Sequence, residues 1–187
     1  MLKRAMDYSH QLLKGVVTTG DKVVDATVGN GGDTVLLATL VGESGVVYGF
    51  DIQKQAIETT KQKLLLTGLS QQVQLFQQGH ETVADVLPES EEISAAIFNL
   101  GYLPQSDKSI ITKGETTLIA IQSLLPHLRK GGRLILVVYY GHDGGLTEKE
   151  AVLEYVTTLP QEECNVLRYE FINQKNDPPF VIAIEKK

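Results

Sequence analysis

Two aspartates flank a short glycine-containing loop early in the chain, in the sequence VVDATVGNGGDT at positions 23–34. Asp25 ends an apolar run, Gly29 and Gly31 lie in the loop, and Asp33 stands where a helical pattern begins. A dinucleotide-binding loop has the spacing G-x-G-x-x-G/A, but the third position here is Thr34. A carboxylate at a helix N-terminus also competes for the backbone amides and repels phosphate. The loop therefore favours a cationic or zwitterionic ligand over a pyrophosphate.

S-adenosylmethionine fits that description, because it carries a sulfonium and an amino-acid head group and has no phosphate. Asp25 is expected to face its ammonium group, while Asp33 is expected to cap the helix or contact the ligand. Asp51, at the end of the next apolar run, can accept hydrogen bonds from both hydroxyls of a ribose. The alternative for Asp51 is an N-cap for the helix that begins near Gln53. An adenine would lie near His80, for which a capping or loop role is the alternative.

Apolar runs rich in Val and Ile alternate with segments of helical period along the chain. This alternation predicts an α/β fold, a doubly wound, seven-stranded, mostly parallel sheet with helices on both faces. Too few residues separate the last two strands for a crossover helix, so they must form a hairpin whose final strand runs antiparallel. The predicted strands are 22–27, 45–51, 72–77, 94–99, 133–140, 164–172 and 180–187. The predicted helices are 31–42, 53–69, 81–87, a long helix within 112–132 that ends at glycines, and 147–159, with one more before the first strand.

The composition is ordinary for a globular protein, with 187 residues, of which 42% are hydrophobic and 21% charged. This length predicts one domain over residues 1–187. No apolar stretch approaches the roughly 18 residues that cross a bilayer, and the N-terminus lacks the apolar core of a secretory signal. A cytoplasmic location without membrane contact is therefore expected. The single cysteine, Cys164, excludes an intramolecular disulfide, and no cluster in the sequence has metal-ligand spacing.

The net charge of −6 argues against an obvious nucleic-acid binder, because phosphate contacts come from Lys and Arg. An enzyme that contacts only a small part of an RNA needs no more than a local basic patch. The segment HLRKGGR at 127–133 could supply such a patch. The more ordinary interpretation of this segment is a polar helix end and a turn before a strand.

The string DATVGNGGDT, followed by FDIQ and FNLGYLP, resembles the class I S-adenosylmethionine-dependent methyltransferases. More narrowly, the chain resembles the small bacterial rRNA-methylase family of the YtqB/MnmM type, and the similarity includes YLPQSDKSI, YYGHDGG and NQKNDPPF. The resemblance implies a Rossmann-like methyltransferase sheet of seven strands, S-adenosylmethionine as cofactor and a tRNA partner. It further implies methylation of the aminomethyl group of 5-aminomethyl-(2-thio)uridine at the wobble position. Methylation of rRNA, a protein or a small amine, and a non-enzymatic RNA-binding module, are the alternatives, and a homodimer is one open possibility for assembly.

The residues Asn99-Leu100-Gly101-Tyr102 follow the fourth predicted strand and resemble the (Asp/Asn)-Pro-Pro-(Tyr/Phe) motif of amino-group methyltransferases, without its two prolines. An aliphatic amine is largely protonated at neutral pH and must lose a proton before it attacks a methyl group. Asn99 Oδ1 and the Leu100 carbonyl can each accept an N–H from such an amine, and Tyr102 can stack on a planar base. The alternative is a strand-end asparagine in a turn, followed by a core tyrosine.

His142 lies in the glycine-bounded segment YYGHDGG and is predicted to accept the proton of the amine, with Asp143 assisting electrostatically. The alternative is a turn with a solvent-facing histidine. Asp177 and Pro178, in NDPPF, match the tetrapeptide motif better but lie in the predicted hairpin. They are expected to form part of the substrate wall, or else a turn stiffened by proline.

The predicted site residues share positions in loops after predicted strands. The predicted cofactor-binding residues are Asp25, Thr27, Gly29, Asn30, Gly31, Asp33, Thr34, Asp51, Ile52, Gln53, Gly79, His80, Glu81 and Asn99. The predicted catalytic residues are Asn99, Tyr102 and His142, and the predicted substrate-binding residues are Leu100, Gly101, Lys108, Asp143, Asp177 and Pro178. Lys108 and Lys113 are candidates for phosphate contacts or for solvated lysines. His10, in the first helix, either covers the cofactor or is an ordinary position of an amphipathic helix.

Overall fold

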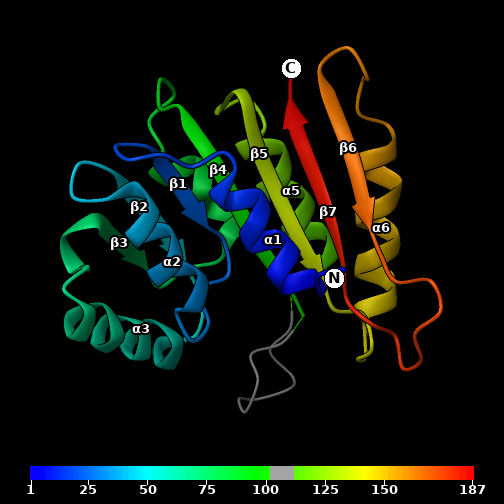
Figure 1. Ribbon diagram of the computed structural model, residues 1–187, viewed down its shortest axis with the longest axis horizontal. Helices are drawn as coiled ribbons and strands as arrows, with labels where there is room; N and C mark the ends of the chain where they lie inside the picture. The colour runs from blue at the N-terminus through cyan, green and yellow to red at the C-terminus, as the bar shows by residue number, and fades with distance from the viewer. Residues whose placement is uncertain (102–111) are drawn as a thin grey trace.

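Seven strands form one sheet in the computed structural model, which describes residues 1–101 and 112–187 (Figure 1). The strand order is β3-β2-β1-β4-β5-β7-β6. Neighbouring strands pair in parallel except for β7, which runs antiparallel to both β5 and β6. The predicted fold class and the predicted hairpin are therefore confirmed. The strands are β1 (Lys22–Asp25), β2 (Val46–Phe50), β3 (Val73–Phe76), β4 (Ile93–Leu100), β5 (Leu128–Val138), β6 (Cys164–Tyr169) and β7 (Phe180–Lys186).

Helices cover both faces of this sheet (Figure 1). Helices α1, α2 and α3 enclose a core that includes Leu37, while α4, α5 and α6 enclose a second core that includes Ile121. The helices are α1 (Ala5–Lys14), α2 (Gly32–Val41), α3 (Lys54–Thr67), α4 (Val83–Val86), α5 (Gly114–Leu124) and α6 (Gly145–Thr157), and the short 3₁₀ turns are η1 (Ser70–Gln72) and η2 (His80–Thr82).

Side chains along each strand alternate between the two cores, and this alternation decides where the last residue of a strand points. Val23 of β1 and Ile97 of β4 lie in the core beneath α1, α2 and α3, whereas the residues that follow them lie in the other core. Two positions later, Asp25 and Asn99 return to the face that α1 and α2 cover. The carboxyl ends of the two central strands therefore present polar side chains to the same pair of helices.

Several predicted boundaries differ from the structure, and two of them differ most. The long helix predicted within 112–132 ends at Leu124 and does not reach the glycines. Pro126 follows closely, and its ring nitrogen has no hydrogen with which to continue the helix. Strand β5 begins at Leu128 instead of 133, because its pairing with β4 starts before a shift in register.

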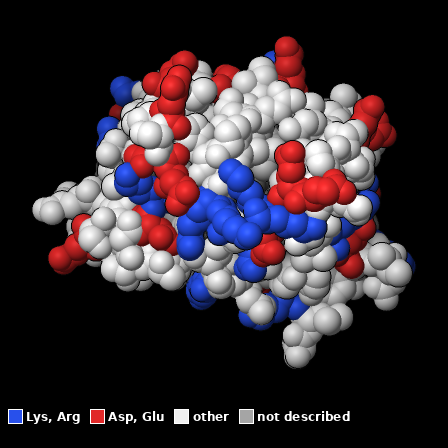
Figure 2. All heavy atoms as spheres, turned by 90° about the horizontal axis from the view of Figure 1, so that it is seen from above, with Lys and Arg blue, Asp and Glu red and all other residues white. Residues whose placement is uncertain are grey.

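The basic segment 127–133 lies at the amino-terminal edge of the parallel strands, which Figure 2 views face-on. Lys and Arg side chains gather in a band across the middle of this face (Figure 2). Within the segment, Arg129 pairs with Asp21 at 3.3 Å and Arg133 pairs with Glu185 at 2.8 Å. This basic segment therefore lies at the opposite end of the strands from the predicted site, and two of its charges are already paired.

Among residues 1–101 and 112–187, no helix is long and apolar enough to cross a membrane. Within the same residues, no group of three or more His, Cys, Asp and Glu side chains is arranged to hold a metal ion.

Candidate active site

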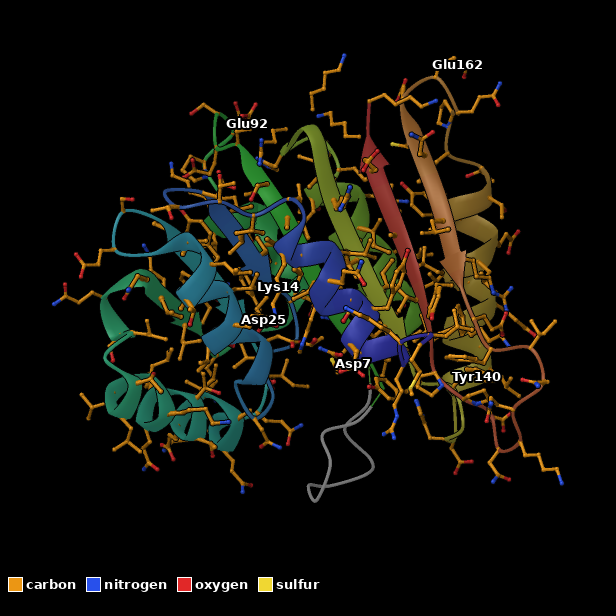
Figure 3. All side chains as sticks on the ribbon, viewed as in Figure 1. Asp7, Lys14, Asp25, Glu92, Tyr140 and Glu162 are labelled. Carbon is orange, nitrogen blue, oxygen red and sulfur yellow. The ribbon has the colours of Figure 1, made fainter. Side chains whose placement is uncertain are left out.

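A cavity of about 660 Å³ opens at the carboxyl edge of the sheet, where β1 and β4 lie side by side and the order of the strands reverses. This is the place at which open α/β sheets bind their ligands, and the volume suits a small molecule. In Figure 3, Tyr140 lies towards this edge, whereas Glu92 and Glu162 lie towards the opposite edge. The wall of the cavity is formed by Met6, Ala26, Thr27, Val28, Gly29, Asn30, Gly32, Asp33, Phe50, Asp51, Ile52, Gln53, Gly79, His80, Glu81, Asn99, Gly101, Thr112, Lys113, Thr116 and Tyr139.

Asp25 lies behind this wall and holds the loop after β1 in place. Its Oδ2 accepts a hydrogen bond from Thr34 Oγ1 at 2.6 Å, and its Oδ1 accepts one from the Thr27 amide at 3.2 Å. Burial, together with the nearby charge of Asp33, raises the pKa of Asp25 to about 7. Asp25 is fully buried, and its oxygens bond to Thr27 and Thr34 instead of lining the cavity, so the expected contact with a ligand ammonium stays a prediction that this arrangement does not favour. Thr34 is equally buried and serves the same internal contact.

Helix α3 fixes the glycine loop from the other side. Gly31 has a left-handed backbone with φ of 74°, and a Cβ at this position would lie 2.5 Å from Thr60 Oγ1. Only glycine allows this conformation and this close approach together. Lys63 donates a hydrogen bond to the Asn30 carbonyl at 2.6 Å. Gly31 therefore shapes the loop, whereas Gly29 and Asn30 line the cavity.

Asp51 stands at the rim of the cavity, at the end of β2. Its Oδ2 accepts the Gly29 amide at 2.8 Å, and its Oδ1 accepts the Gln53 amide at 2.9 Å. Helix α3 has Gln53 as its N-cap, so Asp51 is not the N-cap residue that the alternative required. Burial raises the pKa of Asp51, and the two amides oppose that shift. Each carboxylate oxygen keeps a lone pair with which a ligand hydroxyl can bond.

His80 links the loop after β3 to β1. The Nδ1 atom lies 3.2 Å from the Ala26 carbonyl, and Nε2 lies 3.5 Å from Thr117 Oγ1. The ring packs edge-on against Phe98, and burial lowers the pKa of the imidazole. Both ring nitrogens face protein groups, which supports the structural alternative for this side chain. Its neighbour Gly79 contributes backbone to the same wall of the cavity.

Asn99 is the last polar residue of β4, and both its backbone and its side chain make hydrogen bonds. Its backbone amide donates to Thr27 Oγ1 at 2.7 Å, and its side-chain Nδ2 donates to Asp33 Oδ2 at 2.6 Å. The other carboxylate oxygen of Asp33 lies 2.6 Å from His10 Nε2. Asn99 Oδ1 is buried and has no hydrogen-bond partner among the described residues. Gly31 is the N-cap residue of α2, so Asp33 is not the N-cap residue that the capping alternative required.

Hydrogen bonds through Thr112 link Gly101, which follows β4, to helix α6. Gly101 and Thr112 bond to each other twice, from the Thr112 amide to the Gly101 carbonyl at 3.0 Å and from the Gly101 amide to Thr112 Oγ1 at 2.9 Å. Thr112 Oγ1 donates onward to the buried Glu148 at 2.6 Å, and burial raises the pKa of that carboxyl. The Leu100 carbonyl accepts the Tyr139 amide at 2.9 Å. The Leu100 carbonyl therefore takes part in the hydrogen bonding between β4 and the chain after β5, a contact that the prediction of an amine contact did not include.

Of the remaining predicted residues, those that the structure describes are not part of the cavity wall. His142 places Nε2 2.8 Å from the Tyr139 carbonyl and Nδ1 3.0 Å from the Asp143 carbonyl. Both ring nitrogens thus face acceptors, which does not favour the proposed role as a base. Asp177 is exposed, and a Cβ at Gly141 would lie 3.5 Å from its Cβ, so the hairpin loop borders the loop that carries His142. Pro178 is half-buried in the same hairpin, and Tyr102 and Lys108 lie outside the described residues.

Several wall residues were not predicted as site residues. Met6 comes from α1, Thr112 lies just before α5 and Thr116 in its first turn, and Tyr139 directly follows β5. Tyr139 follows Val137 by two positions, and Val137 lies in the core beneath α1 and α2. This alternation could have placed Tyr139 on the same face of the sheet as Asn99, whereas no local sequence pattern predicts that Met6 of α1 lines the cavity.

The strand order, the antiparallel β7 and a cavity at the carboxyl ends of β1 and β4 define the Rossmann-like class I methyltransferase fold. A family model described as "Putative rRNA methylase" matches residues 47–185. The chain therefore belongs to this family.

Individual relatives agree with that assignment. A crystal structure from Clostridium thermocellum, described as a "putative rRNA-methylase", is 45% identical, covers both chains completely and has a TM-score of 0.97. A methyltransferase-like protein from Streptococcus mutans, solved in complex with SAH, is 44% identical with full coverage of both chains and a TM-score of 0.92. The chloroplastic tRNA (mnm(5)s(2)U34)-methyltransferase of Arabidopsis thaliana is 37% identical over 193 residues, which is 99% of this chain and 70% of the relative.

Proposed function

We propose that this protein is an S-adenosylmethionine-dependent N-methyltransferase that acts on the wobble uridine of tRNA. In this reaction the aminomethyl group of 5-aminomethyl-(2-thio)uridine becomes a methylaminomethyl group. The observation that carries the proposal is Asn99, whose buried and unpartnered Oδ1 lies at the carboxyl end of β4 beside the cavity. The named activity of the Arabidopsis relative supports the identity of the substrate.

The residues around the cavity suit S-adenosylmethionine. Asp51 keeps carboxylate lone pairs at the rim, where it can accept hydrogen bonds from ribose hydroxyls. Gly29 lines the cavity without side-chain bulk, and Ile52 and Phe50 offer apolar surface to a base. The SAH bound to the Streptococcus mutans relative supports the same ligand class.

The chain has to prepare an amine for attack. S-adenosylmethionine supplies a methyl group on a sulfonium, and transfer forms one N–C bond while the S–C bond breaks and its electron pair stays on sulfur. The protonated aminomethyl group first gives up one proton to water, and one of the two N–H groups of the neutral amine then needs an acceptor that leaves the lone pair directed at the methyl carbon. Asn99 Oδ1 is such an acceptor, because it carries no charge that would hold the amine in its protonated form.

The RNA itself has to approach the carboxyl edge of the sheet. Lys113 lies in the cavity wall, at the start of α5, and is the cation of the described wall residues best placed to meet a phosphate. The basic segment 127–133 lies at the other edge and is not assigned to this contact. A cytoplasmic location and a single domain over residues 1–187 remain parts of the proposal, and so does a homodimer as one possible assembly. Cell fractionation and light scattering test the location and the assembly.

Methyl transfer from labelled S-adenosylmethionine tests the function. Bulk tRNA and total rRNA from a strain that lacks the protein serve as parallel substrates, and mass spectrometry resolves the product nucleosides. Label in a methylaminomethyl uridine of tRNA is expected. Label in rRNA alone would replace the substrate with the one that the family description names. No label in either RNA, with S-adenosylmethionine binding intact, would overturn the RNA proposal and redirect the search to proteins and small amines.

A further inference from the structure

Three polar side chains from different elements form a continuous line beside the cavity. His10 of α1 contacts Asp33 of α2 through Nε2 and Oδ1, which are 2.6 Å apart. The second oxygen of Asp33 accepts the Nδ2 hydrogen of Asn99, also at 2.6 Å, from the end of β4. The side chain of Asp33 is 8% exposed and that of His10 is 30% exposed. The line therefore runs from the partly solvated first helix to the buried end of a central strand.

Asp33 decides which end of the Asn99 amide faces away from it. An ionised carboxylate can only accept hydrogen bonds, so it pairs with Nδ2 and repels Oδ1. With Nδ2 held at 2.6 Å, Oδ1 must take the other end of the planar amide, where it is buried and unpartnered among the described residues. The backbone of Asn99 is fixed independently by Thr27 Oγ1 at 2.7 Å. With the backbone fixed, the Asn99 amide could still rotate, and the hydrogen bond to Asp33 prevents this rotation.

His10 in turn limits the rotation of Asp33. Because the carboxylate accepts, His10 Nε2 carries the hydrogen in this contact. Both carboxylate oxygens are then engaged, one by α1 and one by β4. The charge of Asp33 also raises the pKa of two nearby groups, the buried Asp25 and Tyr139, which directly follows β5. Neither of them is recorded in a hydrogen bond with the Asp33 carboxylate among the described residues, so His10 and Asn99 set its orientation.

We propose that Asp33 and His10 are positioning residues for the methyl acceptor: Asp33 orients the Asn99 amide so that Oδ1 accepts the N–H of the amine, and His10 holds Asp33 in that orientation. This inference rests on the proposed amine methylation. It assigns Asp33 to the acceptor side of the site, whereas the sequence predicted a cofactor contact. It also assigns a role to His10, whereas the sequence alone did not distinguish this histidine from an ordinary residue of an amphipathic helix.

Two substitutions test the line, and each has a matched control. Asp33→Asn replaces a pure acceptor with a group that can also donate, so the Asn99 amide can turn. Asp7→Asn makes the same change at an exposed carboxylate of α1, which Figure 3 shows on the helix that also carries His10. His10→Phe removes the donor to Asp33. His10→Gln keeps an N–H donor at about the same reach and should rescue the function.

Nuclear magnetic resonance of the protein without RNA gives a readout that is independent of activity. The Asn99 side-chain amide signals, assigned through an Asn99→Ala spectrum, are expected to shift in Asp33→Asn and His10→Phe and to stay in place in Asp7→Asn and His10→Gln. The ¹⁵N shifts of His10 should report hydrogen on Nε2 in the wild-type protein. Unmoved Asn99 signals in both test variants would overturn the proposal, and the second variant keeps it testable if Asp33→Asn fails to fold.

Kinetics separate the acceptor role from a cofactor role. We expect kcat for tRNA methylation to fall about 10- to 100-fold in Asp33→Asn, comparable to the cost of a misplaced reacting group, while the Kd of S-adenosylmethionine changes less than about threefold. An intact kcat, or a loss confined to S-adenosylmethionine affinity, would overturn the inference. If the wild-type protein methylates no RNA, the proposed function fails, whereas the resonance experiment still reports on the line itself.

Discussion

Thr34 Oγ1 donates a hydrogen bond to Asp25 Oδ2 across 2.6 Å, so the first turn of α2 is tied to the end of β1 beneath the cavity. The carboxyl group that receives this bond is fully buried. Burial and the charge of Asp33 raise its pKa from 3.8 to about 7. The glycine loop is therefore anchored by an acid that favours its neutral form more strongly in the folded protein than in the unfolded chain.

The first prediction concerns the pH dependence of stability. Because the folded pKa of Asp25 lies above the unfolded value, the folded protein binds the proton more tightly, and stability falls as pH rises from about 4 to about 7. Asp25→Asn keeps one acceptor for the Thr27 amide and one donor for Thr34, but does not titrate. We expect the wild-type protein to lose on the order of 2–4 kcal/mol relative to this variant between pH 4 and pH 8. Urea unfolding at both pH values measures the difference, and parallel pH profiles would refute the assignment.

The second prediction concerns Asp51 and cofactor binding. Asp51→Ala removes the acceptor of two loop amides and of the expected ribose hydroxyls. Charge-assisted hydrogen bonds of this kind contribute about 1.5–3 kcal/mol, so the Kd of S-adenosylmethionine should rise about 10- to 100-fold. Isothermal titration calorimetry measures this change. Asp85→Ala, at an exposed carboxylate of α4, is the control that should bind normally. An unchanged Kd in Asp51→Ala would remove its proposed contact with ribose.

The third prediction separates catalysis from binding at Asn99. Asn99→Ala removes the unpartnered Oδ1 but leaves the Thr27 contact, which uses the backbone amide. Turnover should fall by about 100-fold or more, comparable to the loss of a key electrostatic group in other enzymes, while S-adenosylmethionine affinity stays close to that of the wild type. Single-turnover methyl transfer together with calorimetry gives both quantities. Normal turnover would mean that the segment after β4 is only a turn.

The fold could be predicted from the sequence because each strand and helix carries its own periodic pattern. The short connection before β7 was enough to predict an antiparallel final strand, since no crossover helix fits there. The sequence assigned Asp25 to the ligand because it lies next to a glycine loop, whereas the structure buries its side chain behind the cavity wall. Because side chains alternate along β1, the Asp25 side chain lies on the same face as Val23, beneath α2. There Thr34 donates a hydrogen bond to it.

The candidate site was predicted only where its residues lie in sequence motifs. Asp51, Gly29 and Asn99 were found because they follow apolar strands. His10 reaches Asp33 through the packing of α1 across the sheet, and a contact between residues 23 positions apart leaves no local pattern. His142 was favoured for its chemistry, but its ring nitrogens face two backbone carbonyls, which only the three-dimensional path of the loop decides.

The fourth prediction concerns the two hydrogen bonds that the carboxylate of Glu148 accepts. Thr112 and Thr117 both donate to this buried carboxyl, at 2.6 Å and 2.7 Å. Glu148→Ala would leave both hydroxyls without their acceptor and open a small void, so it should cost about 2–4 kcal/mol. Glu148→Gln should cost much less, because the threonine hydroxyls can turn to accept from its amide. Urea unfolding compares both variants with Glu150→Ala, at an exposed glutamate on the same helix. Equal stability of all three variants would show that these two hydrogen bonds contribute nothing to the free energy of unfolding.

The fifth prediction separates backbone strain from steric contact in the glycine loop. Gly31 and Gly68 have nearly the same left-handed backbone, with φ of 74° and 72°. A Cβ at Gly31 would lie 2.5 Å from Thr60 Oγ1, whereas a Cβ at Gly68 would meet no atom within 4 Å. Gly68→Ala should therefore cost only the strain of a non-glycine residue, about 1–2 kcal/mol.

Gly31→Ala should cost that strain and, in addition, the displacement of Thr60, for a total of about 3–5 kcal/mol. Thr60 Oγ1 also donates to the Gly29 carbonyl at 3.2 Å, so its displacement should disturb the loop that lines the cavity. Thermal unfolding and S-adenosylmethionine calorimetry on both variants measure the two effects. Equal destabilisation by the two substitutions, with equal cofactor affinity, would show that α3 adjusts freely and that the close approach of Thr60 does not shape the loop.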